Sequence, residues 1–133
     1  MNKIIIFFTV LAMGFATMVS ADDATVKKML ALYESQGGKN FSASTGKAMW
    51  SKEFSVKGEK RSCVTCHTAD LKSKGKRADT GKVIDPMSPQ VNSQRYNDPK
   101  FIEKWFKRNC KWTMDRECTA QEKGDYLLYL SQN

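Results

Sequence analysis

Apolar side chains recur at the spacing of an amphipathic helix near both ends of the chain. Residues 24–36 carry four such positions before Gly37-Gly38 ends the pattern: Val26, Met29, Leu30 and Tyr33. Residues 119–122 have the Thr-x-x-Glu spacing of a capping box, and an apolar stripe follows at Tyr126, Leu127 and Leu130. The pattern therefore predicts one helix at each end of the folded domain.

Two further helices are expected in the middle of the chain. A short one falls within residues 43–54, around Ala48, Met49 and Trp50. Asp98-Pro99 is a helix start, with Asp as the cap and Pro at the first helical position. The helix that follows carries one apolar face, and we expect the helix to end at the last residue of that face, Asn109. The face consists of Phe101, Ile102, Trp105, Phe106 and Asn109.

The remaining segments carry turn-forming and polar residues without a period. Residues 57–61 are polar, and residues 71–89 are rich in Lys, Gly and Pro, so both are expected to be loops. Neither an alternating strand pattern nor an internal repeat is evident. The expected fold is therefore all-α, with long irregular connections.

The first residues have the pattern of an export signal. A positively charged start at Lys3 precedes an apolar run from Ile4 to Met18, and Val19-Ser20-Ala21 matches a small-x-small cleavage site. The run is shorter than the roughly 20 apolar residues of a membrane span. We therefore expect a signal peptide at 1–21, which is cleaved, and a single periplasmic domain at 22–133 that does not span a membrane.

The chain is basic, with a formal net charge of +8. Removal of residues 1–21 takes away only Lys3 and leaves 21 basic against 14 acidic residues, a charge of +7. A basic balance is compatible with nucleic acid, anionic lipid or an acidic protein as partner. Because export separates the chain from nucleic acid, we expect an acidic partner protein and no nucleic-acid binding.

Cys63-Val64-Thr65-Cys66-His67 matches the Cys-x-x-Cys-His pattern of c-type haem attachment. The spacing suits this chemistry because two thiols must reach the two vinyl groups of one porphyrin while the next residue places its imidazole on the iron. We therefore expect one haem c, bound through two thioethers at Cys63 and Cys66, with His67 as an iron ligand.

Other chemistries of four cysteines fit less well. A thioredoxin-like dithiol needs a βαβ context, which the sequence lacks, and a four-cysteine zinc site needs a second closely spaced pair. Cys110 and Cys118 enclose seven residues instead. In an oxidising compartment we expect them to form a disulfide, which would hold the backbone that presents Asn109.

The second iron ligand must be a residue other than histidine, because His67 is the only histidine of the chain. Methionine is the usual choice in small electron carriers. Met29 is expected in a helix core and Met49 beside the haem motif, which leaves Met87 and Met114. Asn109 competes with them because it shares the apolar face of its helix, although a polar residue at a helix end is usually a cap. The residues alone leave these alternatives open.

Several segments together carry a resemblance to a known family. They are Ile84-Asp85-Pro86-Met87-Ser88-Pro89, Lys104-Trp105-Phe106-Lys107-Arg108-Asn109-Cys110, Arg116-Glu117-Cys118-Thr119 and Glu122-Lys123-Gly124-Asp125. In combination with the haem motif they resemble the sphaeroides haem protein (SHP) family of monohaem cytochromes c, over most of the expected mature chain.

The resemblance implies a class I cytochrome c-like fold with a Cys110–Cys118 disulfide beside the distal haem site. It also implies that Asn109 is the distal iron ligand, and that the iron becomes high-spin and five-coordinate on reduction. An amide oxygen is a hard, weak donor that suits ferric better than ferrous iron. The site that Asn109 leaves would then accept dioxygen, nitric oxide or carbon monoxide.

The expected function is electron transfer combined with binding of these diatomic ligands, without catalysis. Members of the family are associated with a dihaem cytochrome c and a membrane cytochrome b, and a basic loop is the expected docking region for an acidic partner: Lys72, Lys74, Lys76 and Arg77. Two alternatives remain. One is an enzyme that turns over nitric oxide or dioxygen, for which Arg108, Asp115 and Arg116 are the nearby charged residues. The other is a plain carrier with methionine on the iron.

Overall fold

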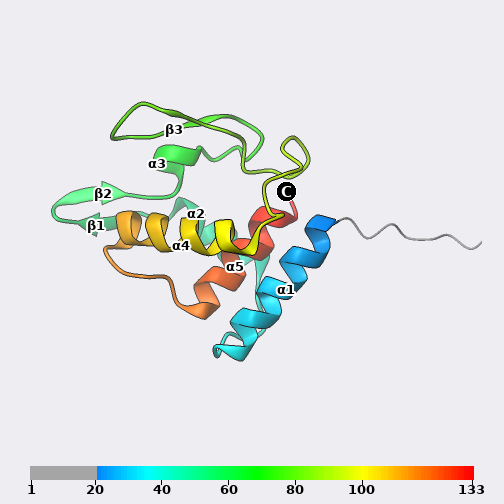
Figure 1. The fold of residues 1–133 in the computed structure, drawn as a ribbon. Helices are drawn as coiled ribbons and strands as arrows, with labels where there is room; N and C mark the ends of the chain where they lie inside the picture. Colours follow the sequence, from blue (N-terminus) through cyan, green and yellow to red (C-terminus); the bar gives the residue numbers. More distant parts are fainter. Residues whose placement is uncertain (1–20) are drawn as a thin grey trace, which may run out of the picture.

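The computed structural model describes residues 21–133, in which helices alternate with short strands and loops (Figure 1). The signal peptide expected at 1–21 lies outside these residues except for Ala21. The elements follow in the order α1 Ala21–Ser35, α2 Ala43–Ser51, β1 Phe54–Val56, β2 Glu59–Arg61, α3 Val64–His67, β3 Gly75–Lys76, β4 Val83–Ile84, α4 Pro99–Met114 and α5 Ala120–Ser131.

The helices expected from the apolar periodicity are confirmed as α1, α2, α4 and α5, and the caps of α4 and α5 are those that the sequence predicts. The Asp98 carboxylate accepts a hydrogen bond from the Lys100 amide at 2.8 Å, and Pro99 is the first residue of α4. The Thr119 hydroxyl accepts from the Glu122 amide at 3.2 Å, while the Glu122 carboxylate accepts from the Thr119 amide at 2.9 Å. These bonds fix where the last two helices begin.

The expectation that the chain contains no strands is wrong in two places. Strands β1 and β2 pair antiparallel, as do β3 and β4. Strands β2, β3 and β4 lie within segments that were expected to be loops, whereas β1 begins at the end of the region 43–54 that was expected to hold a short helix. Between β1 and β2 the chain turns at Lys57 and Gly58, both with positive φ, of 53° and 82°. Two consecutive residues with positive φ give the tight hairpin turn that suits the twist of paired strands.

Helix α4 is longer than its apolar face predicts. It continues past Asn109 to Met114 and ends where Asp115 adopts a left-handed conformation, with φ 56° and ψ 21°. Asn109 therefore lies inside the helix and does not cap it, and Met114 is the last helical residue, whereas we expected it in a loop. The helix extends because Cys110 and Thr113 are buried in its last turns.

The core lies where α5 packs against α1 and α2, with α4 alongside (Figure 1). Tyr33, Met29 and Leu127 are the largest fully buried hydrophobic side chains. The helices α2 and α5 approach closely at Gly46, where a Cβ atom would lie 2.1 Å from the Asp125 carbonyl oxygen. A glycine at this position is therefore required by the backbone of the neighbouring helix.

A partly buried polar cluster joins three of the helices. The Tyr33 hydroxyl of α1 donates to the Glu103 carboxylate of α4 at 2.5 Å, and the Lys123 amine of α5 lies 2.9 Å from the other oxygen of Glu103. Burial, with the neighbouring Glu103 carboxylate, raises the pKa of Tyr33 far above its ordinary value, so the phenol stays a donor. The cluster holds α4 at a fixed distance from the core.

Substitution of Gly46 by Ala should destabilise the fold by about 1 to 3 kcal/mol or more, because the added methyl group meets backbone atoms that cannot move independently. The measurement is the midpoint of denaturant unfolding followed by circular dichroism. Thr45→Ala, at an exposed position of the same helix, is the control and should change the unfolding free energy by less than about 0.5 kcal/mol. Equal midpoints for the two variants would contradict the close approach of α2 and α5.

Candidate functional site

The helix α3 places both cysteines and the histidine of the sequence motif on one turn. The amide of His67 donates to the Cys63 carbonyl at 3.0 Å, and the Cys66 amide to the same carbonyl at 3.3 Å. Ahead of the turn, the Ser62 amide donates to the Thr65 hydroxyl at 3.1 Å. Because positions three apart share a face of a helix, the two sulfur atoms lie on one side, next to the imidazole.

This turn faces a cavity of ≈ 370 Å³, which Cys63, Cys66 and His67 all line. The opposite wall is α4, and further walls come from α2, α5 and the segment 77–96. Most of the lining is apolar or aromatic, including Trp50, Ile102, Phe106, Tyr126 and Leu130. A cavity of this size with apolar walls and a few polar groups is typical of cofactor sites.

His67 is held in its neutral form. Burial, together with the positive charge of Arg95, lowers its pKa to about 4. The Trp50 ring lies 5.4 Å from the imidazole, centroid to centroid. Nδ1 of His67 is buried without a hydrogen-bond partner among residues 21–133. A neutral imidazole at physiological pH is the form that coordinates a metal ion.

The four cysteines divide into two pairs with different chemistry. Cys110 and Cys118 are joined by a disulfide, as expected, with their Cα atoms 5.5 Å apart. Cys63 and Cys66 are not bonded to each other. Burial raises the pKa of the Cys63 thiol to about 11, so this thiol stays protonated at neutral pH. Both free thiols of the haem motif line the cavity, together with Cys110 of the disulfide.

Helix α4 carries four cavity-lining residues at four-residue spacing: Phe101, Trp105, Asn109 and Thr113. Because residues four apart lie one above another on a helix, these side chains form one line along the wall opposite α3. Asn109 is partly buried. Its position inside the helix leaves its amide without the capping role that a helix end would give it.

The methionine candidates separate in space. Met29 is buried in the core, as expected, and Met49 packs beside the core without lining the cavity, whereas Met87 and Met114 both line it. The Met87 carbonyl accepts from the Tyr96 hydroxyl at 2.7 Å. The next amide, of Ser88, donates to the Leu71 carbonyl at 2.9 Å. Met87 is therefore tied to the segment that follows His67.

Several residues that line the cavity were not predicted from the sequence. Arg95 donates to the Pro86 carbonyl at 3.1 Å and to the Asp85 carbonyl, and so supports the Met87 segment from within the wall. Trp50 donates through its indole N–H to the Thr68 carbonyl at 3.1 Å, directly after the haem motif. A periodic apolar pattern identifies Trp50 as buried but does not tell a cavity wall from a packed core, and nothing in the sequence singles out Arg95.

Both the sequence and the fold of this chain are similar to those of known proteins. Residues 36–130 match the family model described as "Domain of unknown function (DUF1924)". The chain is 35% identical to the cytochrome c-type protein SHP of Cereibacter sphaeroides over 125 residues, which cover 93% of this chain and 96% of that protein. The chain belongs to the sphaeroides haem protein family. It is also 32% identical to cytochrome c'' of Methylophilus methylotrophus over 90 residues, 67% of this chain and 62% of that protein.

The fold of the SHP family is confirmed by solved structures. The structure of oxidized SHP, described as an oxygen binding cytochrome c, has a TM-score of 0.75 and 35% identity, and covers 81% of this chain and 96% of that one. The crystal structure of oxidized cytochrome c'' from Methylophilus methylotrophus has a TM-score of 0.71 and 28% identity, with 83% and 92% covered. The class I cytochrome c-like fold expected from the sequence is therefore correct, as is the disulfide.

The cavity fits the haem c that SHP and cytochrome c'' imply. Two free thiols on one helical turn could take up two vinyl groups, and the adjacent neutral imidazole could coordinate iron. The apolar and aromatic walls suit a planar, largely apolar group, and the buried imidazole of His67 lies on the same cavity. No described residue contradicts this group.

The four basic residues of the loop expected to dock a partner do not all lie on the outer surface. Lys72, Lys74 and Lys76 are exposed, as docking requires. Arg77 instead lines the cavity and pairs with Asp79, with Nε 2.9 Å from Oδ1. The pKa of the Asp79 carboxyl falls to about 2, mainly through its hydrogen bond with Arg77. Arg77 therefore belongs to the wall of the site more than to the outer surface.

Removal of the disulfide by Cys110→Ser with Cys118→Ser should lower the free energy of unfolding by about 2 to 3 kcal/mol, since the closed loop is short. Denaturant unfolding with and without reductant measures the effect, and reductant should destabilise only the parent protein. If reductant lowered the midpoint of the double variant as well, the stabilisation would not come from this disulfide.

Proposed function

We propose that this chain is a periplasmic monohaem cytochrome of electron transfer that also binds dioxygen, nitric oxide or carbon monoxide in its reduced state. Cys63 and Cys66 would hold the haem through thioethers, and His67 and Asn109 would be the two iron ligands. When bound, the haem supplies an iron that cycles between the ferric and ferrous states and can take up a diatomic ligand. Its domain would be 22–133 after cleavage of 1–21.

The observation that carries the proposal is the position of Asn109 on the wall opposite α3. The amide is presented from inside α4 and one helical turn from Trp105 and Thr113, which line the same cavity. Met87 also lines the cavity, but from the segment 77–96 and not from α4, and the Ser88 amide next to it is bonded to the Leu71 carbonyl. This arrangement favours Asn109 as the residue that faces His67 across the cavity.

The chemistry of the amide gives Asn109 its role. A neutral carboxamide oxygen is a hard and weak donor, tolerable to ferric iron and poorly matched to ferrous iron. Asn109 is held in place by its helix and by the disulfide that begins at the next residue, Cys110. Release on reduction would therefore need only a change of the side-chain rotamer, while α4 keeps its position.

An enzyme that turns over nitric oxide or dioxygen would need an acid or base close to the bound gas. Of the three charged residues near Asn109 in sequence, Asp115 lies 3.3 Å from Lys111, and Arg116 forms a two-fold ion pair with Glu122, at 2.7 and 2.8 Å. Both are exposed and neither lines the cavity. Arg108 does line it, and a guanidinium is a poor acid. Binding and electron transfer are therefore the better-supported function.

Partners of the proposed carrier follow from surface charge. The exposed lysines at 72, 74 and 76 lie close to the haem motif and suit an acidic partner protein, for which a dihaem cytochrome c and a membrane cytochrome b are the expected candidates. Within residues 21–133, none of the helices has both the length and the apolar character of a membrane span.

Substitution of Asn109 by Ala should change the ferric absorption spectrum while the haem stays attached, because the amide leaves the iron and the thioethers remain. Met87→Ala and Met114→Ala are the matched controls and should leave the ferric ligand field unchanged. The ferrous protein should be high-spin and should bind carbon monoxide without displacement of a strong ligand. Loss of a methionine-to-iron charge-transfer band in either methionine variant would contradict the proposal and support the plain carrier.

A further inference from the structure

The indole N–H of Trp105 is a buried donor that the rest of the chain does not use. Nε1 has no hydrogen-bond partner among the residues that the structure describes, although Trp105 lines the cavity. A buried polar group without a partner costs about 1 to 3 kcal/mol, so native proteins rarely leave one. The indole of Trp50, by contrast, is satisfied by the Thr68 carbonyl. The free N–H therefore indicates an acceptor that enters the cavity from outside the chain.

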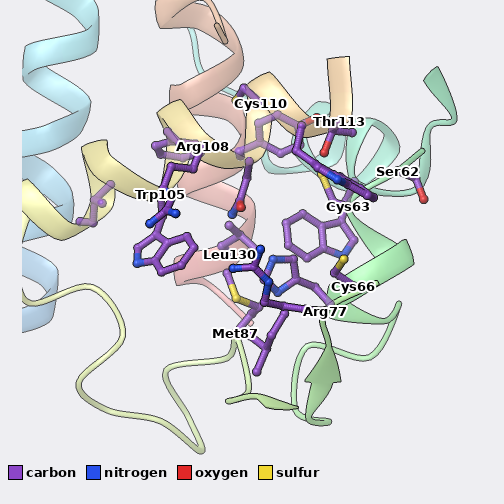
Figure 2. A pocket seen from close by; sticks show the side chains of 18 of the residues that line it. Ser62, Cys63, Cys66, Arg77, Met87, Trp105, Arg108, Cys110, Thr113 and Leu130 are labelled. Carbon is purple, nitrogen blue, oxygen red and sulfur yellow. The ribbon is translucent and has the colours of Figure 1, made fainter. Parts of the chain in front are cut away.

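The position of Trp105 along α4 decides which part of the bound group lies beside it. The last turns of α4 meet the start of the haem motif, since the Arg61 guanidinium donates to the Trp112 carbonyl at 3.0 Å. Thr113 lies at this end, and Trp105 precedes it by two turns, about 12 Å along the helix axis. In Figure 2, Trp105 and the pair Cys63 and Cys66 stand on opposite sides of the cavity.

The chemistry of a thioether-bound haem then fixes its orientation, given the attachment to Cys63 and Cys66 under the proposed function. The vinyl groups lie at one edge of the porphyrin and two carboxylate side chains, the propionates, lie toward the other. An edge fastened at the cysteines turns the carboxylates toward the opposite end of the cavity. We propose that Trp105 donates its indole N–H to a haem propionate and so positions the far edge of the haem.

The charges around Trp105 suit an anion. The Lys104 amine lies 5.9 Å and the Arg108 guanidinium 5.3 Å from the centre of the Trp105 ring. Two cations over the ring make its N–H a stronger donor and attract a carboxylate. Among the other arginines of the lining, Arg77 is paired with Asp79 and Arg95 is bonded to backbone carbonyls. The Trp105 end of the cavity thus carries donors and cations that remain available for an anion.

Substitution of Trp105 by Phe tests this directly, with Trp112→Phe as the matched control. Trp112 lines the same cavity from the same helix, but at the thioether end. Ultraviolet resonance Raman difference spectra, parent minus variant, report whether each indole N–H is hydrogen-bonded in the haem-loaded protein. Trp105 should give the frequency of a strongly bonded N–H, and the frequency of a free indole would overturn the proposal. The quantity measured is the N–H frequency of the parent protein, and the variants serve only to assign each band to its tryptophan.

The pH dependence of the midpoint potential is the second readout. The N–H stabilises the ionised propionate and lowers its pKa, so its removal should move the pH at which the potential begins to fall upward by about one to two units. The charged groups that face this region are Lys104 and Arg108 on α4, Arg77 and Asp79 on the loop, and Arg95. They remain in both variants. A profile equal to that of the parent and of Trp112→Phe would overturn the proposal.

A bound gas is the competing acceptor for this N–H. In that case Trp105→Phe would speed dioxygen release several-fold, leave carbon monoxide release unchanged and leave the pH profile of the potential unchanged, which overturns the propionate assignment. An unchanged gas release with a shifted profile supports it. Failure of the proposed function would look different, because a parent protein without a covalently attached haem would have no Soret absorption at all.

Discussion

The single turn of helix at α3 sets the constraint on which the rest of this structure depends. Two thiols and a neutral imidazole project from it into a cavity of ≈ 370 Å³ that the side chains of the chain do not fill. A domain of this size buries a limited fraction of its surface, and aromatic walls without a filling group forfeit dispersion contacts. The covalent attachment and the stability of the fold are thus linked, since one group both binds the turn and completes the core between α3, α4 and α5.

Helix α4 forms the wall of the cavity opposite this turn. Its period places Trp105, Asn109 and Thr113 in one line, and its two ends are held independently: the first half by the Tyr33–Glu103–Lys123 cluster and the second by the disulfide and the Arg61 contact. A wall fixed at both ends cannot move to follow a weak ligand. If Asn109 is the distal iron ligand, as proposed, a change of its coordination would therefore take place in its side chain, while the helix stays still.

The parts of this arrangement that follow from local sequence could be predicted, and those that depend on tertiary approach could not. The haem motif, the capping residues Asp98 and Thr119, and the apolar faces each act within one turn, so the sequence identifies them. The β1–β2 hairpin was missed because two residues with positive φ create it with little alternation in three-residue strands. The end of α4 was misplaced because the left-handed Asp115 and buried Cys110 determine it, beyond the apolar stripe. The roles of Arg77 and Arg95 in the cavity wall arise from loops that meet only in the folded chain.

Charge and the proposed coordination act in opposite directions on the redox equilibrium at this site. Arg77, Arg95 and Arg108 line the cavity against a single lining carboxylate, Asp79, and the imidazole between them is neutral. Positive charge around a redox centre favours the state with one more electron. An amide ligand at Asn109, as proposed, would favour the oxidised state instead, because it would bind ferric iron more tightly than ferrous iron. The haem carboxylates oppose the first effect. A donor at Trp105 that disperses their charge would therefore influence the same ferric–ferrous equilibrium as Asn109. The two residues lie one turn apart on the same face of α4, but Trp105 would act at the propionate edge of the haem.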